Sequence, residues 1–151
     1  IYNSLMFNNK ENINMELIKE KTTKASTLAE HLDCDIDDLE NGYHNNYFNL
    51  GDMEFLVLTD EEADNLAKEY IQETIWAFSS WFLSKHTNID EWIIQQLQDK
   101  CEGTNEPLLR SIIDIDAVID EAIGLDGRGH FMSTYDGQEI ELNDLYIYRT
   151  N

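Results

Sequence analysis

TDEEADNLAKEYIQETIWAFSSWF, residues 59–82, is the longest and most aromatic amphipathic segment of the 151-residue chain. Apolar or small residues recur along it every three or four positions, which is the pattern of a helix with one buried face. These positions are 63, 66, 67, 70, 71, 74, 75, 77, 78, 81 and 82. Thr59 and Glu62 have the spacing of a capping box, in which each side chain bonds the backbone N–H of the other residue. The segment therefore predicts one continuous helix at the centre of the core.

The N-terminal part of the chain gives weaker patterns. Residues 1–14 are rich in Asn and aperiodic, so we expect a loose arm there. Residues 15–32 predict a helix, although its threonines lower the helix propensity. The folded domain is therefore expected to span residues 15–151, because no internal repeat or linker divides this range.

An early hairpin is predicted just before the central segment. Residues 47–58, YFNLGDMEFLVL, predict two strands around the dipeptide Gly51-Asp52. A glycine in the first position is typical of a type II′ turn. Such a turn places Leu50 opposite Met53 and fixes the register of the two strands.

A late hairpin and several short helices complete the predicted fold. Residues 139–148 alternate between two faces around the two-residue turn Asn143-Asp144. Helix-start signals at Asn88 and Asp114 predict shorter helices in the intervening region. We therefore expect a single α+β domain in which both hairpins share one antiparallel sheet. This sheet would pack against the central amphipathic helix and the shorter helices.

The charge balance is the most unusual property of the sequence. The chain has 31 Asp and Glu residues against 10 Lys and Arg residues, which gives a net charge of −21 at pH 7. Such a surface repels the phosphates of nucleic acids and of anionic lipids, so we expect no direct binding of nucleic acid or membrane. The expected partner is a basic protein. The alternative is that the acidity only keeps the protein soluble.

Several features favour a cytoplasmic protein without metal or cofactor. No segment reaches the roughly 18 consecutive apolar residues of a membrane helix, and the N-terminus has no signal-peptide pattern. Cys34 and Cys101 lack the spacing of a metal or redox motif, as expected for free thiols. The acidic run from Asp33 to Asp38 resembles a calcium loop but lacks the glycine that such a loop requires. The sequence makes no prediction about the oligomeric state.

DGRGHFMSTYDG, residues 126–137, combines glycines with side chains capable of acid–base chemistry. Asp126, His130 and Asp136 could exchange protons, and Arg128 could hold an anion, which would suit a small hydrolase or transferase. The alternative is a tight helix-to-strand connection in which Arg128 pairs with a carboxylate and His130 packs. We favour the structural explanation, because no second histidine or cysteine lies at the spacing of a metal ligand.

The central segment carries the carboxylates that we expect to contact a partner. Helical residues four apart lie on the same face at about 5–6 Å. The candidate partner-binding residues are Glu61, Glu62, Asp64, Glu69, Glu73 and Trp76, followed by a second acidic set of Asp114, Asp116, Asp120 and Glu121. Trp76 falls on the polar face of the predicted helix. Either a second layer such as the N-terminal helix covers this side chain, or it is an exposed aromatic anchor for a basic surface.

Five short motifs give the chain a resemblance to a known group of proteins. They are LTDEEAD (58–64), IWAF (75–78), CEGTNEPLL (101–109), DGRGHFMSTYDG (126–137) and YIYRTN (146–151). Over about residues 44–151 the chain resembles a family of small acidic proteins that bacteriophages, prophages and mobile elements of bacteria encode. The resemblance implies a setting, the cytoplasm of a bacterial host cell, and assigns no role to any residue.

Together these observations predict a non-enzymatic binding protein of phage or mobile-element origin. In that setting, a compact acidic domain is expected to inhibit a host defence protein that binds nucleic acid, such as restriction or CRISPR machinery. Its carboxylates would imitate the phosphates of DNA or RNA in the Lys/Arg groove of the target. Two alternatives remain, which are a hydrolase or transferase built on residues 126–136 and an accessory or structural phage protein.

Overall fold

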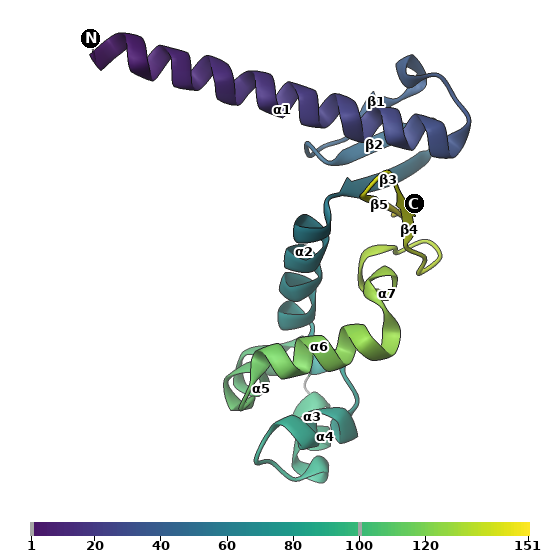
Figure 1. Cartoon of the computed structure of the whole chain (residues 1–151). Helices are drawn as coiled ribbons and strands as arrows, with labels where there is room; N and C mark the ends of the chain where they lie inside the picture. The colour runs from purple at the N-terminus through teal and green to yellow at the C-terminus, as the bar shows by residue number, and fades with distance from the viewer. Residues whose placement is uncertain (1, 100) are drawn as a thin grey trace. The chain divides into compact units, whose positions relative to one another are not determined.

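The computed structural model of the chain describes residues 2–99 and 101–151, and it has an α+β fold with one five-stranded antiparallel sheet (Figure 1). The predicted fold class is therefore confirmed. The chain forms two compact units, of which the first contains residues 1–63 and 133–151 and the second contains residues 64–132. None of the described helices is long and apolar enough to cross a membrane.

The sheet belongs to the first unit and joins the two predicted hairpins. Its strand order is β1-β2-β3-β5-β4, and all neighbouring strands are antiparallel. The strands are β1 (Glu40–Asn41), β2 (Tyr47–Leu50), β3 (Met53–Leu58), β4 (Ile140–Leu142) and β5 (Leu145–Arg149). The predicted pairing of Leu50 with Met53 is confirmed, and β3 pairs with β5 so that both hairpins share the sheet. A positive φ at Asn143 and at Asp144 identifies the tight turn that the late hairpin needs.

Helix α1 (Tyr2–Leu32) packs against the sheet, and the short helix η1 (Ile36–Asp38) follows it (Figure 1). Leu28 of α1 is fully buried and belongs to the hydrophobic core of the sheet. The other buried members of this cluster are Phe48, Phe55, Val57, Leu145 and Ile147. One face of the sheet is therefore closed by the C-terminal half of α1.

The structure differs from the loose arm expected over residues 1–14, because α1 begins at Tyr2. Extending an existing helix adds one hydrogen bond for each residue that becomes fixed, and residues 1–32 contain neither proline nor glycine. Side-chain placement along the expected arm lies outside the described residues except at Ile13, which is exposed.

The second unit is helical. Helix α2 (Asp60–Glu73) starts in the first unit and continues into the second. The remaining elements are η2 (Ile75–Ala77), α3 (Ser80–His86), α4 (Glu91–Gln98), η3 (Cys101–Thr104), α5 (Asn105–Ser111), α6 (Ile115–Asp126) and α7 (Arg128–Met132). Its most buried apolar side chains come from nearly every helix and include Ile71, Ile75, Leu83, Ile94, Leu108, Val118 and Ile119. These contacts give the unit a core of its own.

The prediction of one continuous helix over residues 59–82 is wrong beyond Glu73. Asn105 of α5 replaces the helical hydrogen bonds that are lost at this point. Its Nδ2 donates to the carbonyl of Gln72 at 2.9 Å, and its Oδ1 accepts from the N–H of Trp76 at 3.0 Å. A side chain that arrives from a distant helix therefore stabilises the break, and the local periodicity gives no sign of it.

Two more side chains stabilise the bend that follows. Gln98 Nε2 donates to the carbonyls of Trp76 and Phe78 at 2.8 and 2.6 Å. Ser79 is the N-cap of α3, and its hydroxyl accepts from the N–H of Phe82 at 3.2 Å. The apolar residues expected on one helix face are therefore divided among α2, η2 and α3.

Candidate functional site

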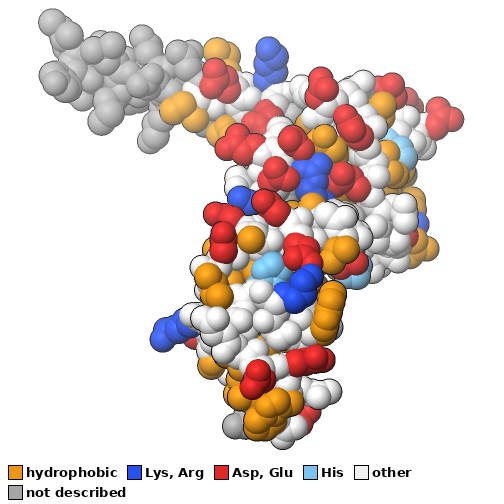
Figure 2. All heavy atoms as spheres, turned by 60° about the horizontal axis from the view of Figure 1, so that its bottom comes forward, with side chains coloured by type: hydrophobic (Ala, Val, Ile, Leu, Met, Phe, Trp, Pro, Cys, Tyr) orange, Lys and Arg blue, Asp and Glu red, His pale blue; other side chains and the backbone are white. Residues whose placement is uncertain are grey.

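Carboxylates are the most frequent charged groups on the face of the molecule shown in Figure 2, where Lys and Arg side chains lie among them. The candidate partner-binding residues fall into two groups according to what they contact. Some bond to other residues of the chain, and others are exposed without an ion pair among the described residues.

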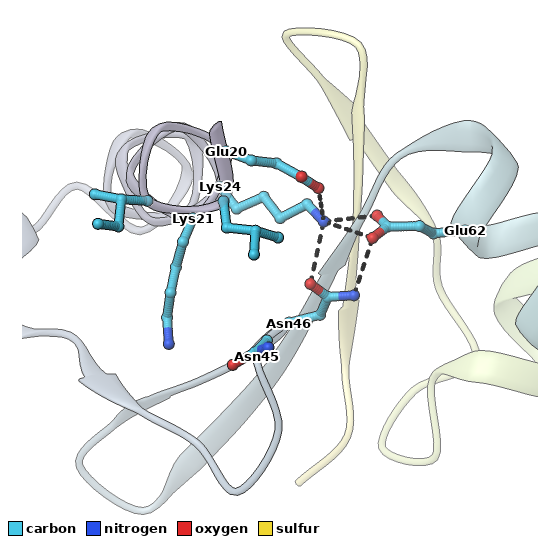
Figure 3. A pocket seen from close by; sticks show the side chains of 8 residues that line it. Glu20, Lys21, Lys24, Asn45, Asn46 and Glu62 are labelled. Atoms are coloured by element: carbon cyan, nitrogen blue, oxygen red, sulfur yellow. Dashed lines mark hydrogen bonds and ion pairs between the residues drawn. The ribbon is translucent and has the colours of Figure 1, made fainter. Parts of the chain in front are cut away.

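Glu62 belongs to the group that bonds to other residues of the chain. Its Oε2 accepts from the N–H of Thr59 at 2.7 Å, and its own N–H donates to the Thr59 hydroxyl at 3.3 Å, so the predicted capping box is present. The same carboxylate binds Lys24 Nζ at 2.6 and 2.8 Å and Asn46 Nδ2 at 3.2 Å (Figure 3). Lys24 is only 1% exposed, and it also pairs with Glu20 at 2.8 Å.

The pKa of Glu62 reflects these contacts. Burial alone would raise it, but the hydrogen bonds from Lys24 and from the Thr59 N–H outweigh burial and lower the pKa below its usual value. Glu62 is therefore ionised and satisfied within the first unit. The structure thus gives Glu62 a structural role, and its contact with a partner stays a prediction.

A hollow of about 560 Å³ lies beside this network, and Figure 3 shows Lys24 pointing across it toward Glu62 while Lys21 points away. Leu17 and Ile18 of α1 form the apolar part of its lining. Among the described residues, no buried side-chain nitrogen or oxygen lacks a hydrogen-bond partner. The network therefore joins α1 to the start of α2, and its buried polar groups are all hydrogen-bonded within the chain.

In the second unit, each Lys and Arg that the structure describes is paired with a carboxylate of the same unit. The pairs are Lys68 with Asp116, Lys85 with Glu121, Arg110 with Glu106, and Arg128 with Asp64. Asp64, Asp116 and Glu121 were candidate partner-binding residues, so intramolecular cations already neutralise part of the expected surface. The remaining carboxylates carry the surplus negative charge.

Glu121 contacts two basic side chains. It accepts from Lys85 and lies 2.9 Å from His86 Nε2, so it links α6 to α3. The hydrogen bond from Lys85 is the main reason that the pKa of Glu121 falls below its usual value, and His86 adds to the effect. Asp114 also has a structural role, because its carboxylate caps α6 by accepting from the N–H of Ala117 at 3.1 Å.

Four of the candidate carboxylates are exposed and have neither an ion pair nor a side-chain hydrogen bond among the described residues. They are Glu61, Glu69, Glu73 and Asp120. Glu69 and Glu73 lie one turn apart on α2, within the second unit, and Asp120 lies on α6 of the same unit. These side chains are therefore the part of the predicted surface that makes no such contact within the described residues.

The DGRGH segment, residues 126–130, contains the end of α6 and the first residues of α7. Gly127 has a φ of 76° and ends α6, with its N–H bonded to the carbonyl of Ile123 at 2.8 Å. Arg128 opens α7, and its Nη1 donates to Asp64 Oδ1 at 2.8 Å, with only 10% of the arginine side chain exposed. The expected pairing of Arg128 with a surplus carboxylate is therefore present. Gly129 is buried within α7, and no positive φ is found there.

The remaining residues considered for acid–base chemistry lie in different parts of the chain. Asp126 and His130 are exposed in the second unit, whereas Asp136 belongs to the first unit. Asp136 accepts from the N–H of Gln138 at 2.9 Å and from the Ser133 hydroxyl at 2.7 Å. These two bonds lower the pKa of Asp136, the one from Gln138 most, which is the opposite of what a general acid needs. The contacts of Arg128 and Asp136 thus support a structural role for both.

Trp76 lies in η2 and is half-buried, so it is not on the polar face of a long helix. It lines a second hollow of about 530 Å³ within the second unit. The local sequence pattern does not predict this hollow, because it forms only when the chain bends after Glu73. The one available signal was the concentration of aromatic residues between positions 70 and 82.

The described residues contain no group of three or more His, Cys, Asp or Glu side chains placed to hold a metal ion. Comparisons of the chain with protein-family models, with curated proteins and with solved structures find no match.

Proposed function

We propose that this chain is a non-enzymatic acidic binding protein that occupies the Lys/Arg groove of a protein that binds nucleic acid. The observation that carries the proposal is the pairing of every described Lys and Arg in the second unit with a carboxylate. Because those cations are used internally, Glu69, Glu73 and Asp120 display negative charge that no described Lys or Arg of the unit neutralises. A surface of that kind attracts basic proteins and repels nucleic acid.

The spacing of these carboxylates supports the comparison with a nucleic acid. Glu69 and Glu73 are separated by four positions of α2, so their side chains emerge from one face about 5–6 Å apart. A groove that binds successive phosphates presents several Lys and Arg side chains at a comparable spacing. Carboxylates on a helix can therefore bind the Lys and Arg side chains of such a groove and keep DNA or RNA out of it.

The setting of the proposal comes from the resemblance of five short motifs to small acidic proteins of phages, prophages and mobile elements. In a bacterial cytoplasm invaded by such an element, the partner would be a host defence protein of the restriction or CRISPR type. Inhibition would follow from occupancy of the groove and would require neither a cofactor nor catalysis.

The test compares three immobilised proteins that capture partners from a bacterial lysate at low salt. They are the wild type, the variant with Glu69→Lys and Glu73→Lys, and a control with Glu40→Lys and Glu141→Lys. The control residues are exposed on the edge strands β1 and β4, where lysine is well tolerated, and the change in net charge is the same.

The wild type and the control should retain the same nucleic-acid-binding protein, and the variant reversed on α2 should lose it. Release should follow a rise in salt, since exposed charges are screened within about 10 Å at 0.1 M. Equal retention by all three proteins would contradict the proposal.

A further inference from the structure

The hollow that Trp76 lines has mostly aromatic walls. Its volume of about 530 Å³ falls within the range of roughly 300–1,000 Å³ that is common for ligand sites. The aromatic side chains around it are Tyr70, Trp76, Phe78, Trp81, Phe82 and Phe131. All of them belong to the second unit, and they come from α2, η2, α3, α7 and the connection after η2.

The aromatic rings that line the hollow pack against one another. Phe78 stacks on Phe82 with ring centres 5.3 Å apart and on Phe131 with ring centres 6.2 Å apart. Tyr70 lies 6.2 Å from Phe131. Because Phe82 and Phe131 are buried, this wall is part of the core of the unit and is fixed before any ligand arrives.

The acidic side chain in the lining of the hollow is a carboxylate. Asp126, at the end of α6, is the carboxylate in its lining, and no described Lys or Arg lines it. Glu69 and Glu73 lie on α2 beside two lining residues, Tyr70 and Thr74. His130 is the other titratable side chain in the lining. A cation that enters the hollow would therefore meet aromatic faces and negative potential together.

One of the rings already binds a cation within the chain. Lys85 Nζ lies 4.5 Å from the centre of the Trp81 ring, which is the geometry of a cation–π contact. Trp81 is nevertheless 58% exposed, so much of its surface remains available. The aromatic rim thus accepts a positive group without losing its access to solvent.

We propose that this hollow receives the guanidinium group of an arginine from a basic segment of the partner protein. The inference rests on the proposed function and adds the chemical class that the surface recognises. Arginine suits the site better than lysine, because its planar guanidinium is weakly hydrated, stacks on aromatic rings and can bond a carboxylate such as Asp126 through two N–H groups. Aromatic stacking would give specificity, while Glu69 and Glu73 supply longer-range attraction.

The test uses the peptide acetyl-Gly-Gly-Arg-Gly-Gly-amide and the same peptide with citrulline, which keeps the shape of arginine but has no charge. Each peptide is titrated into the ¹⁵N-labelled full chain while the indole N–H signals are followed by NMR. Trp76 and Trp81 line the hollow, whereas Trp92 of α4 is exposed outside its lining and serves as an internal control.

The arginine peptide should shift the signals of Trp76 and Trp81 and leave that of Trp92 unchanged. The citrulline peptide should bind about tenfold more weakly, because it loses the charge and the cation–π contact. Asp126→Asn should weaken the arginine peptide by up to about fivefold, the range of an exposed ion pair, and Trp92→Leu should have no effect. Equal binding of both peptides, or equal shifts of all three indoles, would overturn the inference.

These outcomes separate the inference from the function on which it rests. If the two peptides bind alike while reversal of Glu69 and Glu73 still abolishes capture of the partner, only the arginine pocket is wrong. If the arginine peptide binds selectively while that reversal leaves capture intact, the pocket stands and the carboxylate surface of α2 is not the partner site.

Discussion

Lys24 Nζ lies 2.6 Å from Glu62 Oε2, and the lysine side chain is almost completely buried between α1 and the start of α2. Removing one partner of a buried ion pair leaves the other uncompensated, which can cost about 3–5 kcal/mol. Glu62 is 34% exposed, so water can solvate it in part. We expect Lys24→Met to lower the free energy of unfolding by about 1–3 kcal/mol in urea denaturation. A double variant with Glu62→Gln should lose less than the sum of the two single losses, and strict additivity would show that the pair is not coupled.

The lowered pKa of Glu62 makes this contribution depend on pH. A carboxyl group with a lower pKa in the folded protein than in the unfolded chain stabilises the fold fully above the unfolded value, about 4.3 for Glu. The stabilisation is lost as the pH falls through the folded value. The stability difference between wild type and Glu62→Gln should therefore be constant near neutral pH and shrink below about pH 4.3. A difference that stays the same down to pH 3 would refute this assignment.

Asn105 should be essential for the break between α2 and η2. Asn105→Ala removes a donor from the Gln72 carbonyl and an acceptor from the Trp76 N–H, so we expect a loss of about 1–3 kcal/mol of stability. Asn65→Ala on the exposed surface of α2 is the matched control and should change stability by no more than about 0.5 kcal/mol. Thermal unfolding followed by circular dichroism measures both. Similar melting temperatures for the two variants would argue against the role of Asn105.

One glycine inside α6 and one directly after it should respond to alanine with opposite signs. Gly127 has a φ of 76°, where a side chain is strained although the space is open, so Gly127→Ala should cost about 1 kcal/mol. Gly124 is exposed inside the helix without a positive φ, and Gly124→Ala should add about 0.5–1 kcal/mol. Urea denaturation of the pair tests whether the DGRGH segment is a helix-ending connection. Changes of the same sign would be inconsistent with that geometry.

The sequence predicted those parts of the fold that depend on local chemistry. The type II′ signal at Gly51 and the alternation around Asn143-Asp144 were sufficient for the strand registers, because a turn and a buried face together allow one pairing. The capping box at Thr59 and Glu62 was equally local. In each case the partner residues are only a few positions apart along the chain.

The features that sequence analysis missed depend on long-range contacts. Lys24 reaches Glu62 across 38 positions, and Asn105 reaches Trp76 across 29 positions. The first contact gives a candidate partner-binding carboxylate a structural role, and the second stabilises the bend that forms the aromatic hollow. The periodicity of apolar residues indicates which face of a helix or strand is buried. It contains no information about contacts with side chains that are distant in the sequence.

Competition with nucleic acid tests the central claim most directly. The protein captured by the wild-type chain is labelled, saturated with this chain, and titrated with duplex DNA and with RNA at constant salt, while fluorescence anisotropy reports the complex. If carboxylates of α2 occupy the groove that normally holds phosphates, nucleic acid should displace the chain completely, and the apparent affinity for nucleic acid should fall as the chain concentration rises. A ternary complex in which the partner holds nucleic acid and this chain together would contradict the account.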